Sequence, residues 1–176
     1  MDFTLTEEQT ALQDTVRRFA QSELPEIARH IEDTDESPGP DIMHRFAELG
    51  LLGVNLPEAY GGLDFGFMGL GAVIEESGRR LTASPLFSSV VLGASAIILG
   101  GSEQQKQALL PAIASGETSL ALALEESSHH RPTLISTSAE KDGDNYRLSG
   151  SKVSVIDGAS AEQLIVVART SGKNGE

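Results

Sequence analysis

Apolar residues recur at intervals of three and four along the first two-thirds of the chain, as on the buried faces of amphipathic helices. Thr6 and Gln9 form a capping box at the start of the first such stretch, and Ser102 and Gln105 form one at the start of the last. The pattern predicts helices from about Thr6, from Pro25, around Phe46, over residues 67–81, over residues 85–99 and from Ser102. The apolar positions expected to face the core are Leu12, Val16, Phe19, Ala20, Ile27, Ala28, Ile31, Ile42, Met43, Phe46, Leu49, Leu70, Val73, Ile74, Leu109, Leu110 and Ile113.

Prolines and glycines interrupt the helical pattern at two places. Residues 33–40 are polar and contain two prolines, so we expect a loop there. Residues 51–64 contain three glycines and a proline and are expected to be irregular, after a helix that ends at Gly50. Residues 85–99 form the most apolar segment of the chain and predict a buried core helix.

The pattern changes from helical spacing to alternation near Ser119. Residues 120–124 alternate leucine with alanine, and the runs 135–141 and 146–156 flank a turn-forming Asp-Gly-Asp-Asn cluster. A further β-rich run covers residues 163–170. The predicted fold class is therefore α+β, with an N-terminal all-α helical domain over residues 1–117. Residues 118–176 are expected to be the first strands of an incomplete antiparallel β-barrel or sandwich domain with an unpaired edge.

Charge and composition exclude several kinds of function. The chain has 13 Lys and Arg against 26 Asp and Glu residues, a net charge of −13, which argues against nucleic acids and anionic membrane surfaces as partners. Cysteine is absent, so disulfides, thiolate metal sites and cysteine nucleophiles are excluded. The N-terminus does not resemble a signal peptide, and no apolar run reaches the roughly 18 residues of a membrane span. We expect a cytoplasmic protein without a membrane span.

Three short motifs are candidates for chemistry, each with a simpler alternative. The glycine-rich residues 61–66 lack the strand or lysine of a phosphate-binding loop and fit a tight turn before a helix. The sequence His129-His130-Arg131 follows two serines and could hold a phosphate, or could be a solvated loop. Glu125 and Glu126 could act as paired acid and base, or could be solvated charges at a strand end. No pattern indicates a metal site.

Three longer segments together resemble the acyl-CoA dehydrogenase family. Residues 49–62 resemble the family's segment L-G-L-x-G-x-x-x-P-E-x-Y-G-G, which is quite specific. Residues 101–117 are similar to G-[ST]-x-x-Q-K-x-x-x-L-P-x-[IL]-x-x-G-E, and residues 148–152 to the hairpin L-x-G-x-K. The segments occur in the family's order at suitable spacing, so the resemblance covers essentially the whole chain.

The resemblance implies part of an FAD-dependent enzyme that oxidises an acyl-CoA thioester to the 2,3-enoyl-CoA and passes electrons to an acceptor. The family's base is a glutamate on a third, helical domain, so no catalytic residue is expected in residues 1–176. We expect a fragment, or a subunit of a homo- or hetero-oligomer that takes the remainder from elsewhere. The segment from Val155 to Ala161 is more like members from steroid or side-chain degradation, which pair unlike subunits. The alternative is a non-catalytic subunit of the same fold that supports a flavin-bearing partner.

The resemblance also assigns cofactor-facing positions, and several of them differ from the family pattern. In the family's T-E-P-x-A-G-S-D motif the threonine position is Leu124 here, the glutamate is Glu125, and the proline is Glu126. The family's W-I-T-N becomes residues 154–157 and lacks the tryptophan that packs on the flavin. Main-chain N–H groups at 124 and 156 can still donate to the cofactor. The expected cofactor-binding residues are Leu122, Leu124, Ser127, His129, His130, Ser154 and Ile156.

Overall fold

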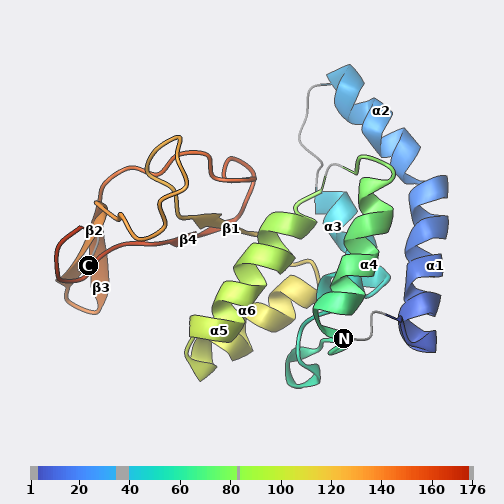
Figure 1. Cartoon of the computed structure of the whole chain (residues 1–176), viewed down its shortest axis with the longest axis horizontal. Helices are drawn as coiled ribbons and strands as arrows, with labels where there is room; N and C mark the ends of the chain where they lie inside the picture. The colour runs from blue at the N-terminus through green and yellow to red at the C-terminus, as the bar shows by residue number, and fades with distance from the viewer. Residues whose placement is uncertain (1–3, 35–39, 83, 175–176) are drawn as a thin grey trace.

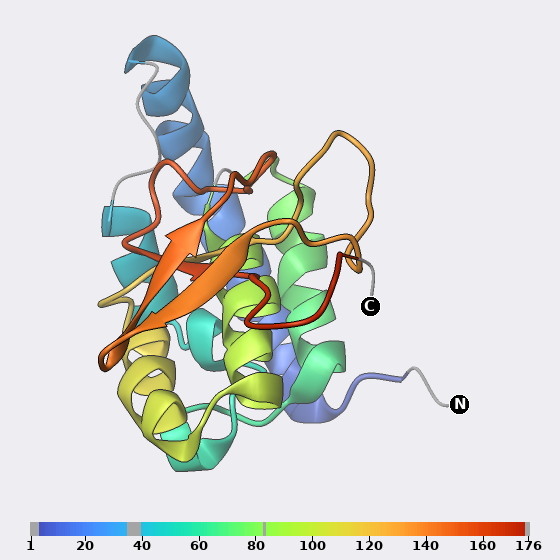
Figure 2. The same ribbon diagram turned by 90° about the vertical axis from the view of Figure 1, so that its left-hand side faces the viewer.

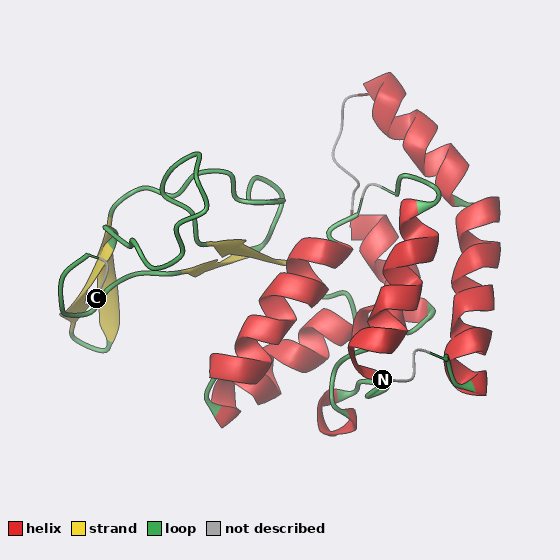
Figure 3. Ribbon diagram, viewed as in Figure 1, coloured by secondary structure: helices red, strands yellow, loops and turns green. Residues whose placement is uncertain are grey.

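The computed structural model describes residues 4–34, 40–82 and 84–174, with helices first and strands after them (Figures 1 and 3). The α-helices are α1 (Glu7–Ser22), α2 (Leu24–Thr34), α3 (Pro40–Glu48), α4 (Gly66–Gly78), α5 (Ser95–Gly100) and α6 (Glu103–Ala114). Short 3-10 segments are η1 (Leu51–Gly53) and η2 (Glu58–Tyr60), and η3 (Phe87–Ala94) is a wider π-helical segment. Among the residues described, no helix is both long and apolar enough to cross a bilayer.

Helix α1 follows the sequence prediction in detail. The Thr6 side chain accepts a hydrogen bond from the Gln9 N–H, and the Gln9 side chain accepts one from the Thr6 N–H, so the capping box is complete. These two bonds satisfy donors that every helix N-terminus leaves unpaired. The buried residues of the helix are Leu12, Val16, Phe19 and Ala20, as the spacing predicts.

The next two helices confirm part of the prediction and leave part of it outside the described residues. Pro25 lies in the first turn of α2, where its missing N–H has no cost. The side chains of Ile27, Ala28 and Ile31 are outside the described residues. The loop expected over residues 33–40 is shorter than predicted, because residues 33 and 34 belong to α2 and Pro40 begins α3, and residues 35–39 are outside the described residues. Helix α3 buries Ile42, Met43 and Phe46 in the core.

The segment between α3 and α4 is irregular but well packed. Gly50 has a φ of 72°, which a glycine adopts without strain, and ends the helix as predicted. Four apolar residues that follow are fully buried, namely Leu51, Leu52, Val54 and Leu56. The segment therefore contributes core side chains without forming a long helix.

Residues 85–99 differ from the single buried helix that was predicted. The segment from Phe87 to Ala94 is a π-helix, and an α-helix continues from Ser95. Ser88, Ser89 and Val90 are fully buried, but Phe87 is 45% exposed and Leu99 is 87% exposed. One side of the segment packs in the core, whereas Phe87 and Leu99 near its two ends reach the surface. A segment that is apolar on all sides can bury only the side that meets other helices.

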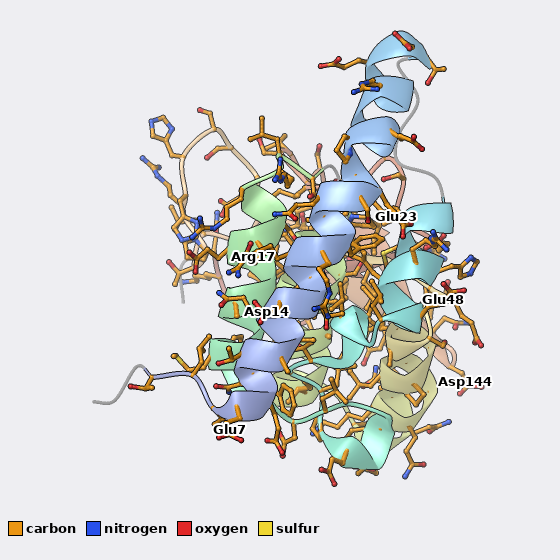
Figure 4. All side chains as sticks on the ribbon, turned by 90° about the vertical axis from the view of Figure 1, so that its right-hand side faces the viewer. Glu7, Asp14, Arg17, Glu23, Glu48 and Asp144 are labelled. Atoms are coloured by element: carbon orange, nitrogen blue, oxygen red, sulfur yellow. The ribbon has the colours of Figure 1, made fainter. Side chains whose placement is uncertain are left out.

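Helix α1 is joined to α4 by an ion pair between a partly exposed arginine and a buried glutamate. Arg17 donates to both carboxylate oxygens of Glu76, at 2.8 and 3.2 Å, and to Asp14 at 3.0 Å. The Glu76 side chain is only 3% exposed, and the hydrogen bond from Arg17 lowers the pKa of its carboxyl group. Figure 4 shows Asp14 and Arg17 on the side of α1 that borders α4.

The strands form two open two-stranded sheets. Strand β1 (Leu120–Ala123) pairs with β4 (Gln163–Val166), and β2 (Ser138–Asp142) pairs with β3 (Asn145–Ser149). The hairpin β2–β3 is antiparallel around the predicted turn, whereas β1–β4 is parallel, contrary to the antiparallel expectation. The α+β class is confirmed, and the described strands do not close into a barrel. Figure 1 shows β1 and β4 between the helices and the hairpin, and Figure 2 shows the hairpin crossing in front of the helices.

Side-chain hydrogen bonds join the helices to the first strand. The buried Ser89 hydroxyl of η3 accepts from the Leu120 N–H at 3.0 Å and donates to the Leu120 carbonyl at 3.2 Å. The Glu162 carboxylate accepts from the Ser119 N–H at 2.6 Å and from the Ser119 hydroxyl. The start of β1 is therefore fixed on one side by η3 and on the other by the residue before β4.

Candidate functional site

The candidate site lies where β1 ends, at the cofactor-facing positions that the sequence assigns. The Gln163 N–H bonds to the Ser119 carbonyl, and the Val167 N–H bonds to the Ala123 carbonyl. Main-chain groups alternate in direction along a strand, so those of Leu122 and Leu124 face away from β4. The N–H of Leu124 makes no hydrogen bond within the described part of the chain. Leu122 and the N–H of Leu124 therefore face an edge of β1 that no described strand covers, which we call the open edge. The Leu124 carbonyl on the same edge accepts from Lys152.

Glu126 is held by three donors just beyond this strand. Its carboxylate accepts from the N–H of Ser136 at 2.6 Å, the N–H of Thr137 at 2.8 Å and the Lys152 ammonium at 2.8 Å. The Glu126 side chain is 14% exposed and that of Lys152 is 8% exposed. The hydrogen bond from Lys152 is the largest cause that holds the pKa of Glu126 far below its usual range, and the N–H groups of Thr137 and Ser136 add to it. Glu126 is thus a charged structural acceptor, neither a solvated charge nor an acid at neutral pH.

Lys152 also joins the end of β1 to the segment after β3. Its ammonium donates to the Leu124 carbonyl at 3.0 Å in addition to Glu126. The neighbouring Val153 N–H donates to the Glu125 carbonyl at 2.9 Å. These bonds place residues 152–153 beside residues 124–126, although the two segments are far apart in the sequence.

Glu125 faces the loop that follows the strand. One of its carboxylate oxygens lies 2.6 Å from His130 Nδ1, and the other accepts from the Arg131 N–H at 3.3 Å. The hydrogen bond with His130 is the largest cause of the lowered pKa of Glu125, and burial opposes it. The carboxylate is therefore engaged with its own loop.

The serine and histidine residues of this loop are exposed. Ser127 accepts from the His129 N–H at 3.3 Å, and the Ser128 hydroxyl lies 3.3 Å from His129 Nδ1. A hollow of about 200 Å³ lies beside them, lined by acidic, basic and polar side chains. Its lining residues are Glu125, Glu126, Ser127, His129, Arg131, Leu134, Ser136 and Asn174.

Ser154 lies in the irregular segment after Lys152, and Ile156 begins the turn that follows it. Ser154 has a φ of 52° and Asp157 one of 56°, both in the left-handed region. The Ile156 side chain is 49% exposed, and its N–H has no hydrogen-bond partner among the residues described. The contacts of residues 152–153 bring this turn toward the end of β1, so the two segments that were predicted to face the cofactor are neighbours.

The sequence reasoning missed the pairing of Glu126 with Lys152. The sequence places Lys152 in the L-x-G-x-K motif, and Glu126 beside Glu125 at the proline position of the T-E-P motif. A lysine and a glutamate on separate β-rich segments give no periodic signal, so their contact could not be inferred from spacing. Within the described ranges, no group of three or more His, Asp or Glu side chains is placed to hold a metal ion.

Comparisons with known proteins agree on one family. The profile described as "Acyl-CoA dehydrogenase, N-terminal domain" matches residues 6–117. The bovine mitochondrial isovaleryl-CoA dehydrogenase is 35% identical over 170 residues, which cover 94% of this chain and 40% of that protein.

Two solved structures show the same similarity in three dimensions. The Tcur3481-Tcur3483 steroid ACAD G363A variant has a TM-score of 0.82 and 37% identity, over 94% of this chain and 45% of that one. A glutaryl-CoA dehydrogenase from Mycobacterium smegmatis in complex with FADH2 has a TM-score of 0.83 and 26% identity, over 94% of this chain and 43% of that one. The chain spans 40–47% of the length of the curated relatives it matches.

Proposed function

The chain belongs to the acyl-CoA dehydrogenase family, and from this premise we propose that it supplies part of a flavin-dependent enzyme that oxidises an acyl-CoA thioester to the 2,3-enoyl-CoA. Residues 1–117 would be the helical N-terminal domain and residues 118–176 the first strands of the β domain. The rest of the active site would come from sequence or subunits beyond this chain, because the chain matches less than half the length of its curated relatives. Substrate, cofactor and electron acceptor are all part of this proposal.

The open end of β1 is the observation that carries the proposal. The N–H groups of Leu124 and Ile156 have no partner among the described residues and lie on two neighbouring segments. Unpaired main-chain donors at a strand end fit a planar ring whose edge carries hydrogen-bond acceptors, as FAD does. The residues that would face FAD are Leu122, Leu124, Ser127, His129, His130, Ser154 and Ile156. FAD would accept the hydride removed from the acyl chain.

The carboxylates of this site are unsuited to act as the base that removes the α proton. Glu126 accepts three hydrogen bonds and has a strongly lowered pKa, and the pKa of Glu125 is also lowered. A general base works best when its pKa lies near the working pH, so both groups are too weakly basic. On this proposal the base lies outside residues 1–176, as in the family's plan.

The alternative is a non-catalytic subunit that supports a flavin-bearing partner. Leu124 has no hydroxyl to donate, and Ser154 offers no aromatic ring to pack on a flavin. The ionised carboxylates of Glu125 and Glu126 line the same hollow as His129 and Arg131, which weakens it as a site for a diphosphate. The similarity to a steroid ACAD of two named components, Tcur3481 and Tcur3483, is in keeping with this alternative.

The test is to purify the full-length protein that contains this chain, alone and with any co-encoded homologue. A yellow protein whose flavin bleaches when an acyl-CoA is added supports the enzyme. A colourless protein that restores or stabilises flavin binding in a homologous partner favours the alternative, a non-catalytic supporting subunit. If the assembly keeps both its yellow colour and its activity when this chain is omitted, the enzyme proposal and the supporting-subunit alternative are both wrong.

Residues 1–176 alone are expected to show neither tight FAD binding nor acyl-CoA oxidation. They offer main-chain donors on one side of a flavin and no suitable base, so substrate and cofactor would not be held in a reactive geometry. The measurement is flavin absorbance of the purified chain with added FAD and a panel of acyl-CoAs. Bleaching that disappears in Glu125→Gln would disprove the expectation and make Glu125 the base.

A further inference from the structure

Glu126 and Lys152 connect three segments of the chain at the strand end. Lys152, which follows β3, donates to the carbonyl of Leu124 just beyond β1. Glu126 accepts from the amides of Ser136 and Thr137, which lead into β2. The ion pair between the two side chains, at 2.8 Å, links these bonds into one network. The end of β1, the entry to β2 and the exit from β3 therefore meet at a single, largely buried pair of charges.

A carboxylate is required at position 126 for this network. It accepts two main-chain N–H bonds and one ammonium bond at the same time, and an ionised group forms stronger hydrogen bonds than a neutral one. Arg169 supports the same region, since its N–H bonds to the Thr137 carbonyl at 2.9 Å and its side chain to the Ile135 carbonyl at 2.5 Å. Proline, which the resembling family motif has here, offers no side-chain acceptor, so this network is a feature of the present chain.

We infer that Glu126 and Lys152 are positioning residues for the cofactor-facing end of β1. The Leu124 N–H points away from β4, because the carbonyl of the same peptide, that of Ala123, accepts from the Val167 N–H. Lys152 fixes the next peptide through the Leu124 carbonyl, and so holds the chain in place where it leaves β1. Glu126 closes residues 127–135 into a loop whose two ends are held at one point, and this loop carries His129 and His130. The part of the inference that concerns FAD rests on the proposed function, whereas the ordering of the strand end does not.

The test uses the full-length protein, in its assembly if it has one, and two readouts. Hydrogen exchange of the Ser136 and Thr137 amides, which donate to Glu126, reports the strand end itself, and the dissociation constant of FAD reports its consequence. The variants are Glu126→Gln, Lys152→Met, Lys152→Arg and the exchanged pair Glu126→Lys with Lys152→Glu. Glu140→Gln is the matched control, because Glu140 is an exposed carboxylate on β2.

Glu126→Gln and Lys152→Met are expected to speed exchange at Ser136 and Thr137 and to weaken FAD binding by about tenfold or more, as the loss of a charged hydrogen bond would. Lys152→Arg retains charge and donors, so it should stay nearer to the wild type. The exchanged pair restores opposite charges but places a lysine where two amides need an acceptor, so it should not rescue either readout. Glu140→Gln should match the wild type.

Three results would overturn the inference. The first is unchanged amide exchange in folded Glu126→Gln and Lys152→Met. The second is rescue by the exchanged pair, which would mean that only opposite charges are needed at the two positions. The third is faster amide exchange with unchanged FAD affinity in a flavin-bearing protein. If the wild-type protein binds no flavin, the proposed function fails, and amide exchange alone then decides whether the pair positions the strand end.

Discussion

Two glycines of the helical part differ in what an added methyl group would meet. A Cβ at Gly62 would lie 1.9 Å from the Leu56 carbonyl oxygen, which is main chain and cannot rotate away. A Cβ at Gly71, in α4, would meet nothing within 4 Å. Gly62→Ala should therefore lower the free energy of unfolding by roughly 3 kcal/mol or more. Gly71→Ala should raise it by about 1 kcal/mol, because alanine is the better helix former.

Urea unfolding of the two variants beside the wild type checks this prediction. Equal effects at positions 62 and 71 would contradict it, since both substitutions add one methyl group to a glycine. The second glycine of the Y-G-G motif would then have no packing role.

The ionised state of Glu126 predicts a pH dependence of stability. Its pKa in the folded chain is lowered from the usual 4.5, so the unfolded chain binds a proton first as the pH falls. The stabilisation is therefore fully present above about pH 4.5 and is lost as the pH falls toward the folded-state pKa. Glu126→Gln should unfold more easily than the wild type at pH 7, and the difference should shrink below pH 4.5.

Urea unfolding midpoints of the wild type and Glu126→Gln, measured from pH 7 down to pH 3, test the direction of this pH dependence. Glu140→Gln again serves as the control, with little difference from the wild type at either end. A gap between Glu126→Gln and the wild type that widens toward acid pH would contradict the assignment of Glu126 as an ionised acceptor.

At the scale of elements, the joint between η3 and β1 depends on Ser89. Its hydroxyl bonds to both the N–H and the carbonyl of Leu120, whereas the equally buried Ser88 bonds to the Pro85 carbonyl of its own helical segment. Ser89→Ala leaves a buried main-chain donor without a partner, which costs about 1–3 kcal/mol. Ser88→Ala removes a local bond only and should cost less.

Ser88→Ala and Ser89→Ala each remove one buried hydroxyl from η3, but only Ser89→Ala removes the hydrogen bonds to β1. Comparing the two variants therefore separates the cost of losing a buried hydroxyl from the cost of losing the link between η3 and β1. Thermal unfolding gives the size of each effect, and amide exchange at Leu120 shows where it acts. A larger loss for Ser88→Ala would show that η3 and β1 are not coupled through Ser89.

For the whole molecule, apolar side chains at the surface predict association. Phe67 is 68% exposed, Leu81 is 88% exposed and Leu99 is 87% exposed, on the helical part of the chain. The described sheets also leave strand edges unpaired, and such edges and apolar patches favour contacts with other chains. Residues 1–176 are therefore expected to be oligomeric or poorly soluble.

Light scattering after size-exclusion chromatography measures this property directly. A monodisperse monomer at high concentration would disprove the expectation. In the assembly that we propose, the same surfaces would be covered by the remainder of the enzyme or by a partner subunit.

The sequence by itself determined the features that depend on near neighbours. Capping boxes at Thr6 and Ser102 involve residues three positions apart, and the buried face of α1 follows from spacings of three and four. The turn between β2 and β3 is likewise local, with Gly143 at a φ of 64°. These features could be predicted because a few adjacent residues decide their free energy, whatever the rest of the chain does.

Only the tertiary structure decided how distant segments meet. Glu126 and Lys152 are 26 residues apart, Ser89 and Leu120 are 31 apart, and Ser119 and Glu162 are 43 apart. The parallel pairing of β1 with β4, against the antiparallel expectation, belongs to the same group. No periodicity links such residues, because their contacts form only after helices and strands have packed and the free energy gained depends on burial and on donors supplied by other segments.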